Sequence, residues 1–201
     1  MRVTIENYDE YRSLIEALQN SIQKLDFWTE QQKPRHPGFC KGCDKFTQIY
    51  IHEYCSFGKN INLRETCECD CGLNQRARLL WTELTNHVEE GGSIALFEAG
   101  TPIQRRLESK YLVSSSLYLG EDFIGGASYS DENCDDRMHQ DITRLSYKTE
   151  SFDAVVHNDV LEHVPNYIAA LNECFRVLKS GGALIFTCLF LERTLKQLLG
   201  P

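Results

Sequence analysis

Residues 151–188 constrain the fold more strongly than any other part of the chain. They read SFDAVVHNDVLEHVPNYIAALNECFRVLKSGGALIFTC, and the apolar run that begins at Phe152 is typical of a strand buried on both faces. A helix is predicted next, because Pro165 suits a first helical turn and apolar residues then recur at helical spacing. These apolar positions, which we expect on the buried face of the helix, are Ile168, Leu171, Phe175 and Leu178.

A turn and a second strand are predicted after this helix. Gly181 and Gly182 supply the positive-φ residues that commonly end a helix, and residues 183–190 are again continuously apolar. Two buried strands joined through a helix form a βαβ unit, and such units build parallel sheets. The chain is therefore predicted to be an α/β protein.

The loop between the first strand and the helix carries several polar side chains, among them His157, Asn158, Asp159 and His163. Open α/β sheets bind their ligands at the carboxyl ends of their strands, so this loop is predicted to border a ligand site. Imidazole groups titrate near neutral pH, which makes His157 and His163 candidates for a catalytic general base. The alternative for His163 is a structural role as a brace for the following helix.

The strings FDAVVHNDVLEHV and FRVLKSGGALIFT closely resemble the matching region of class I S-adenosylmethionine-dependent methyltransferases, in particular the type 11 methyltransferase family. The resemblance implies a Rossmann-like, doubly wound, mostly parallel sheet. It also implies S-adenosyl-L-methionine as cofactor and transfer of its methyl group to an acceptor. A nicotinamide enzyme is disfavoured, because the dinucleotide fingerprint requires three glycines and AGTPIQRR contains one.

The same resemblance assigns the cofactor contacts residue by residue. The family's first strand falls on residues 93–97, so Glu98, Ala99 and Gly100 are expected to form the turn against the cofactor. Glycines let a backbone approach a ligand closely, and this chain keeps only the first of the family's three.

The ribose and adenine contacts are assigned in the same way. The family's ribose-binding acid falls on Leu117, which leaves Glu121 either as its substitute or as an ordinary solvated residue. Asp141 and Ile142 match the pair that meets the adenine, and the alternative for Asp141 is a turn with Thr143. The full set of predicted cofactor-binding residues is Glu98, Ala99, Gly100, Glu121, Asp141, Ile142, His157 and Asn158.

A group of cysteines precedes this region and predicts a metal site. Cys40 and Cys43 form a C-x-x-C pair, in which two thiolates from one tight turn occupy half of a tetrahedral zinc site. The second pair is less regular, because its spacing is C-x-C-x-C. The predicted ligands of a structural Zn²⁺ are Cys40, Cys43, Cys69 and Cys71, with Cys67 as the alternate ligand and Cys55 or His52 as further donors.

The string CGLNQRAR, which begins at Cys71, resembles the end of a zinc-ribbon-like segment that several type 11 methyltransferases carry before the catalytic domain. Its expected role is structural, and the alternative is that it holds the substrate over the cofactor. Disulfides are disfavoured, because nine cysteines are an odd number and the opening MRVTIENYDE is too polar for a signal segment. A cytoplasmic protein with reduced thiols is predicted.

Charge and hydropathy narrow the expected partners. The formal net charge of −8 disfavours a broad phosphate-binding surface and argues against a nucleic-acid partner. No apolar run is long enough to cross a membrane. Small-molecule or protein substrates are therefore favoured over nucleic acid, and we expect a small-molecule acceptor.

Three segments are predicted along the chain. Residues 1–37 hold an amphipathic helix over 8–25 and a linker, residues 38–76 form the zinc-ribbon-like segment, and residues 77–201 form the methyltransferase domain. That domain is expected to be truncated, because its sheet ends after five strands and a short final helix. The fifth strand would then be a bare apolar edge, which a partner protein, a homodimer contact or a rearranged sheet would cover.

Three functional classes remain open at this stage. The first is an active methyltransferase, and the second is a degenerate methyltransferase scaffold that acts as a zinc-stabilised binding module. The third is a zinc-dependent interaction protein in which the Rossmann-like half is only structural.

Overall fold

The computed structural model describes residue 13 and residues 35–51, 62–131 and 134–188. The chain divides into two units, and Arg35–Cys188 forms one of them. The other unit is Met1–Pro34 with Leu189–Pro201, and the helices predicted over residues 8–25 and at the end of the chain fall on these residues. Both of these predictions lie outside the described residues.

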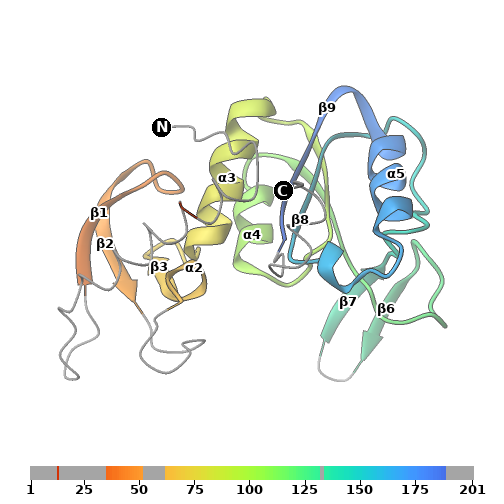
Figure 1. The fold of residues 1–201 in the computed structure, drawn as a ribbon, viewed down its shortest axis with the longest axis horizontal. Coiled ribbons are helices and arrows are strands. Elements are labelled where there is room, and N and C mark those ends of the chain that lie inside the picture. The colour runs from red at the N-terminus through yellow and green to blue at the C-terminus, as the bar shows by residue number, and fades with distance from the viewer. Residues whose placement is uncertain (1–12, 14–34, 52–61, 132–133, 189–201) are drawn as a thin grey trace. The chain divides into compact units, whose positions relative to one another are not determined.

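A six-stranded sheet forms the centre of the Arg35–Cys188 unit, with the strand order β6-β7-β5-β4-β8-β9 (Figure 1). All neighbouring strands pair in parallel except β6 and β7, which are antiparallel. The predicted α/β fold with a mostly parallel sheet is therefore confirmed. The strands are β4 (Ser93–Leu96), β5 (Leu112–Leu117), β6 (Ser128–Asp131), β7 (Cys134–His139), β8 (Phe152–Asn158) and β9 (Leu178–Thr187).

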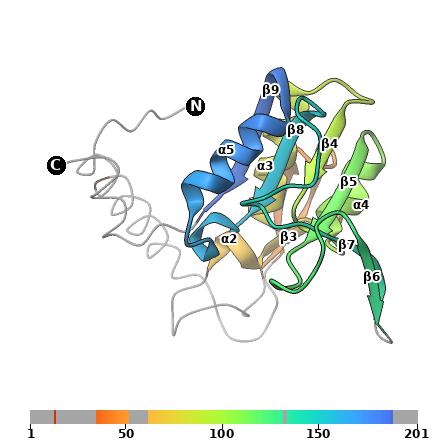
Figure 2. The same ribbon diagram turned by 90° about the vertical axis from the view of Figure 1, so that its right-hand side faces the viewer.

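Helices cover both faces of this sheet, as Figure 2 shows, and each face has its own core. Ile94 and Leu96 of β4 point toward α3 and α4, whereas Ala95 between them points toward α5. This alternation follows from the two-residue period of a strand, so a strand with helices on both sides is apolar throughout. The helices are α3 (Gln75–His87), α4 (Pro102–Glu108), α5 (Tyr167–Val177) and the 3₁₀ helix η1 (Leu161–His163).

The helix α5 differs from its prediction in length and in orientation. It ends at Val177, and the Gly181 region already belongs to β9, where the register with β8 shifts between Phe152 and Ala154. The expected buried face is wrong as well, because Ile168 is 53% exposed and Phe175 is 64% exposed. The face that packs on the sheet carries smaller side chains, which let helix and sheet approach closely, and these are Ala170, Cys174 and Val177.

The Cys-rich segment forms a small antiparallel sheet in the order β1-β2-β3, followed by the start of α3. Leu73, which follows this sheet, is fully buried in the same core as α3, β4 and α4, and Cys71 packs against that core. The segment and the large sheet therefore share apolar packing. Its elements are β1 (Arg35–Cys40), β2 (Lys45–Ile51), α2 (Leu63–Thr66) and β3 (Cys67–Cys69).

Among the described strands, β9 pairs only with β8 and lies at the edge of the sheet, as predicted for the fifth strand of the methyltransferase order. The antiparallel strand β6 at the opposite edge was not predicted, because its sequence SYSD is polar. In the described part of the chain, no helix has the length and apolar character that crossing a bilayer requires.

Candidate functional site

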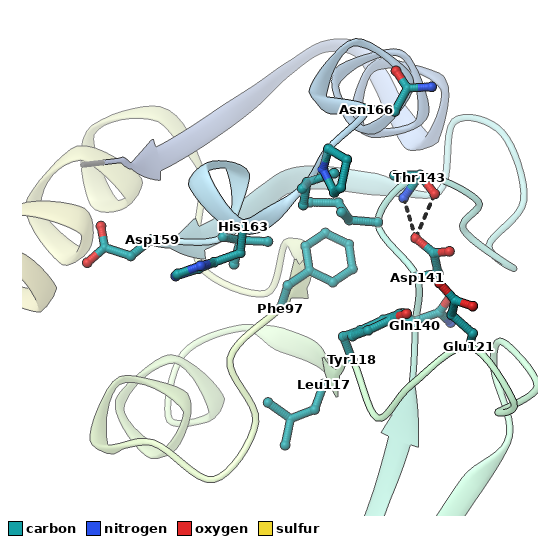
Figure 3. Close-up of a pocket in the computed structure, with 14 residues that line it drawn as sticks. Phe97, Leu117, Tyr118, Glu121, Gln140, Asp141, Thr143, Asp159, His163 and Asn166 are labelled. Carbon is teal, nitrogen blue, oxygen red and sulfur yellow. Dashed lines mark hydrogen bonds between the residues drawn. The ribbon is translucent and has the colours of Figure 1, made fainter. Parts of the chain in front are cut away.

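A cavity of about 490 Å³ opens at the carboxyl ends of β4, β5, β7 and β8 (Figure 3). Parallel strands end at the same edge of a sheet, which is why residues from four separate parts of the chain meet there. Its size suits a small organic ligand. The lining residues are Phe97, Leu117, Tyr118, Glu121, Gln140, Asp141, Ile142, Thr143, Asp159, Val160, His163, Val164, Pro165 and Asn166.

Asp141 and Ile142, both predicted to bind the adenine, line the cavity directly after β7. The Oδ1 atom of Asp141 accepts hydrogen bonds from the backbone N–H of Thr143 at 2.8 Å and from its hydroxyl at 2.7 Å. The turn with Thr143, considered as the alternative from the sequence, is therefore present. It leaves Oδ2 without a partner among the described residues, so this oxygen is available to a ligand.

The β5 end of the cavity lacks the expected acid. Leu117 is the last residue of β5 and lines the cavity, and Tyr118 follows it. Glu121, the predicted substitute, also lines the cavity and is exposed. The carboxylate is thus at the cavity but in a solvated position.

The Glu98–Ala99–Gly100 turn does not contribute to the cavity lining, although Phe97 just before it does. Burial raises the pKa of the Glu98 carboxyl, and this carboxyl accepts a 2.5 Å hydrogen bond from Asn158 Nδ2. Asn158, also predicted to bind the cofactor, is therefore engaged with Glu98.

Gly100 has the left-handed backbone that favours glycine, with φ +82°. Its N–H donates to Gln104 Oε1 at 2.7 Å, and a Cβ at this position would lie 3.2 Å from the guanidinium of Arg137. Side chains of this protein thus occupy the surroundings of the turn that was predicted to approach the cofactor.

The two candidate histidines lie in different environments. His157 is fully buried in β8, its ring stacks on Phe186 at 5.0 Å, and it does not line the cavity. Burial lowers the pKa of His157 to about 4, so the side chain is neutral near pH 7. His163, in contrast, is exposed and lines the cavity from η1.

Asp159 is a lining residue that the sequence did not single out. It adopts a left-handed backbone, with φ +49°, and its side chain is 16% exposed. One carboxylate oxygen accepts from Arg64 and the other from Arg76. Burial alone would raise the pKa of this carboxyl, but the hydrogen bond from Arg64 and the charge of Arg76 lower it overall.

The four predicted zinc ligands come together in the Cys-rich segment, with all Sγ atoms within 4.8 Å of one another. The spacing is 3.3 Å for Cys43–Cys69 and 3.9 Å for Cys40–Cys71. Sulfurs that share a tetrahedral Zn²⁺, with bonds of about 2.3 Å, lie about 3.8 Å apart. The donor set fits zinc in number, type and spacing, and Cys67 is not part of the group.

Part of the chain matches a known protein family. Residues 122–186, which run from the loop before β6 to β9, match the family model described as "Methyltransferase domain". This segment is similar to part of a methyltransferase domain. The match covers 65 of the 201 residues, about a third of the chain. It includes four of the residues that line the cavity, namely Asp141, Ile142, Asp159 and His163.

Solved structures with similar folds include a protein described as a methyltransferase from Bacillus halodurans, with 16% identity and a TM-score of 0.42 over 56% of this chain and 46% of that chain. A protein described as an S-adenosyl-L-methionine-dependent methyltransferase from Methanococcus maripaludis shows 13% identity and a TM-score of 0.41 over 60% and 58%. The [4+2]-cyclase SpnF shows 14% identity and a TM-score of 0.38 over 89% and 59%. The chain spans about half the length of such structures. No curated protein matches it.

Sequence reasoning thus named some of the residues that line the cavity. Glu121, Asp141, Ile142 and His163 line it, whereas Glu98, Ala99, Gly100, His157 and Asn158 do not. The lining residues it missed include apolar side chains close to strand ends, such as Phe97 and Val160. Their position near strand ends was the sequence signal that could have identified them. They were missed because apolar side chains at such positions resemble ordinary core residues.

Proposed function

We propose that the chain is an S-adenosyl-L-methionine-dependent methyltransferase with a small-molecule acceptor. The observation that carries the proposal is the pair Asp141–Ile142, which lines the cavity inside the segment that matches the methyltransferase family. A carboxylate beside an aliphatic side chain suits an adenine, because the oxygen accepts from the exocyclic amine while the aliphatic group packs on the ring.

The residues fit the adenosine part of this cofactor. Phe97, Leu117 and Ile142 provide an apolar wall of the cavity. Glu121 is the lining residue that we assign to binding the ribose hydroxyls. When bound, the cofactor supplies an electrophilic methyl group. The protein's part is to orient the two reactants and to keep water out, which contributes much of the rate of a transfer between bound molecules.

The fit is incomplete at the methionine part. Gln104 already accepts from the N–H of Gly100, and Arg137 lies against the same turn. Binding the whole cofactor as the resemblance implies would require both side chains to move. His163 is our candidate for a base that accepts a proton from the acceptor, since it is the histidine that lines the cavity.

The second function that an observation favours is a degenerate methyltransferase scaffold that binds a partner or ligand without transferring a methyl group. Leu117 in place of the ribose acid and the occupied Gly100 turn favour it. In that case the Cys-rich segment is the part to test for partners.

The deciding experiment is calorimetric titration of the zinc-loaded protein with S-adenosyl-L-methionine and S-adenosylhomocysteine. The methyltransferase proposal expects micromolar binding of both, weakened about tenfold in Asp141→Ala through loss of a hydrogen bond to a charged group. Thr143→Ala is the matched control, because it removes one donor to Asp141 and keeps the carboxylate. A folded protein that binds neither ligand would support the scaffold instead.

We also propose that Cys40, Cys43, Cys69 and Cys71 hold a structural Zn²⁺ in a cytoplasmic protein. Thiolates bind the metal, and burial raises the pKa of the metal-free Cys43 and Cys69 thiols to about 11, so zinc binding would release protons. A reducing compartment keeps such thiols available to the metal.

A further inference from the structure

We propose that the Cys-rich segment positions the loop after β8, through Arg64 and Arg76 on Asp159, and thereby links metal binding at the Cys cluster to ligand binding in the cavity. The Cys cluster here means Cys40, Cys43, Cys69 and Cys71. The inference rests on the proposed function only for the choice of ligand used as a probe.

Asp159 is held from two directions. Its backbone N–H donates to Thr187 O at 2.9 Å, and the Thr187 hydroxyl donates to its Oδ1 at 3.1 Å. The two carboxylate oxygens accept from Arg64 and Arg76, one each. In Figure 3 the Asp159 carboxylate points away from Phe97, at the opposite end of the lining from Asp141. Asp159 thus lines the cavity while Arg64 and Arg76 hold its carboxylate.

The backbone conformation of Asp159 is one that such contacts help to hold. A left-handed conformation in a residue other than glycine costs on the order of 1 kcal/mol and persists where surrounding contacts determine it. Asp159 is one of the described non-glycine residues with positive φ, and it immediately precedes Val160, which lines the cavity. Without the two arginines, we expect residues 159–164 to lose this conformation.

The two arginines are fixed by the same segment that builds the Cys cluster. Arg64 lies on α2, which leads directly into β3 with Cys67 and Cys69. Arg76 lies in the first turn of α3, five residues after Cys71. A hydrogen-bonded network joins them, because Glu65 pairs with both arginines, at 3.0 Å to Arg64 and 3.4 Å to Arg76.

This network is mostly shielded from water. The side chains of Arg64, Glu65, Arg76 and Asp159 are 16–28% exposed. Paired charges in such surroundings are screened less than exposed pairs, and removing one partner leaves the others uncompensated. The contacts from the Cys-rich segment to Asp159 are therefore stronger than ordinary surface ion pairs.

A second contact fixes the Cys cluster to the domain. Arg106 on α4 donates to the carbonyl of Gly42, which lies in the turn between Cys40 and Cys43. The same guanidinium lies over the Trp81 ring at 4.8 Å, on α3. Movement of the metal-binding turn would thus be transmitted to α3, whose first turn carries Arg76.

Hydrogen exchange tests the positioning step without requiring any ligand. The amides of Asp159, His163 and Val164 donate to backbone carbonyls and report on the loop. In zinc-loaded Arg64→Ala/Arg76→Ala we expect exchange over residues 159–164 to rise about tenfold or more, as loss of charge-assisted hydrogen bonds implies. Lys110→Ala, which removes an exposed pair with Glu90, should leave this exchange unchanged. Unchanged exchange in the double variant would overturn the proposal.

The double variant could unfold, and the single variants then decide. Arg64→Ala and Arg76→Ala should each give a smaller rise confined to residues 159–164, and the lysine versions Arg64→Lys and Arg76→Lys should restore part of the protection. A rise spread evenly over the whole unit would instead indicate general destabilisation and count against a positioning role.

The linkage itself is tested by reciprocity, with S-adenosylhomocysteine as the probe. If ligand binding and metal binding are coupled, zinc raises the affinity for the ligand by a certain factor. The ligand must then raise the affinity for zinc by the same factor. Competition with a chromophoric chelator should show several-fold tighter zinc binding in the presence of the probe, and no such shift in Arg64→Ala/Arg76→Ala. If the probe tightened zinc binding equally in the Arg64→Ala/Arg76→Ala variant, the proposal that the coupling runs through these two arginines would be overturned. A wild-type protein that does not bind the probe would refute the proposed function, while hydrogen exchange would still decide the positioning step.

Discussion

Asp153 shows how a single carboxylate joins three strands at the amino end of the sheet. Its Oδ2 atom accepts from Lys179 Nζ on β9 and from the N–H and hydroxyl of Ser93 on β4, each at 2.8 Å. The hydrogen bond from Lys179, followed by those from Ser93, lowers the pKa of the Asp153 carboxyl to about 2, below its ordinary value.

The sign of the resulting pH dependence follows from this shift. The folded pKa is the lower one, so the stabilisation is complete above about pH 4 and is lost as the pH falls toward about 2. We expect Asp153→Asn to lower the free energy of unfolding near pH 6, and to lower it less near pH 3. Urea unfolding at both pH values measures this, with Ser93→Ala as a control that removes only the hydroxyl donor. Equal losses at both pH values would contradict it.

At the residue scale, the sequence predicted contacts whose chemistry is distinctive and local. Asp141 and Ile142 were found because an acid beside an aliphatic residue after a strand matches a known pattern. Asp159 was not assigned a role, because its partners Arg64 and Arg76 are 95 and 83 residues away in the chain. No spacing rule connects residues that only tertiary folding brings together.

At the scale of elements, the helix α3 offers a matched pair of neighbouring leucines. Leu80 is 2% exposed in the core, whereas Leu79 is 56% exposed. We expect Leu80→Ala to cost about 2–5 kcal/mol of unfolding free energy, because it leaves a cavity and removes buried apolar surface. Leu79→Ala should change it by less than about 0.5 kcal/mol. Urea unfolding of both variants checks the difference, and comparable losses would contradict the packing of this helix.

A second prediction at this scale concerns the choice between neighbouring cysteines. Cys69→Ser should abolish stoichiometric zinc binding, since Cys69 is one of the four clustered thiols. Cys67→Ser should keep one zinc per chain, because Cys67 Sγ lies by Arg78 at 3.6 Å rather than in the cluster. Elemental analysis of the purified variants measures the zinc content. Loss of zinc from Cys67→Ser would mean that Cys67 is a zinc ligand, as in the alternate ligand set considered from the sequence.

Strand and helix types were predictable from local pattern, whereas orientation was not. Asn74 and Asn166 cap their helices by accepting from the N–H three residues on, at 2.9 and 3.1 Å. Helical periodicity after Pro165 located α5. The buried face of α5 was predicted from its largest apolar residues, Ile168 and Phe175, and the structure buries the smaller ones. Periodicity identifies a helix, but the close approach of helix and sheet selects which face packs.

At the scale of the whole molecule, the Cys-rich segment and the six-stranded sheet behave as one unit in their packing. Leu73 is fully buried among residues of α3, β4 and α4, and Arg106 of α4 reaches the turn that contains Gly42. A segment that contributes to a shared core cannot unfold without exposing that core. The boundary at residue 76 was predicted because the sequence pattern changes there. In the folded chain, the packing continues across this boundary.

This packing predicts how the protein responds to loss of metal. Chelation should lower the melting temperature of the main transition, and no separate early transition of the Cys-rich segment should appear, because binding to the folded state stabilises everything that folds with the site. Calorimetry with and without chelator measures this, and Cys71→Ser should reproduce the chelated trace. Two resolved transitions, with the upper one unaffected by chelation, would show that the segments fold independently. A single metal-dependent transition would mean that zinc at the Cys cluster stabilises the large sheet and the strand ends that border the cavity.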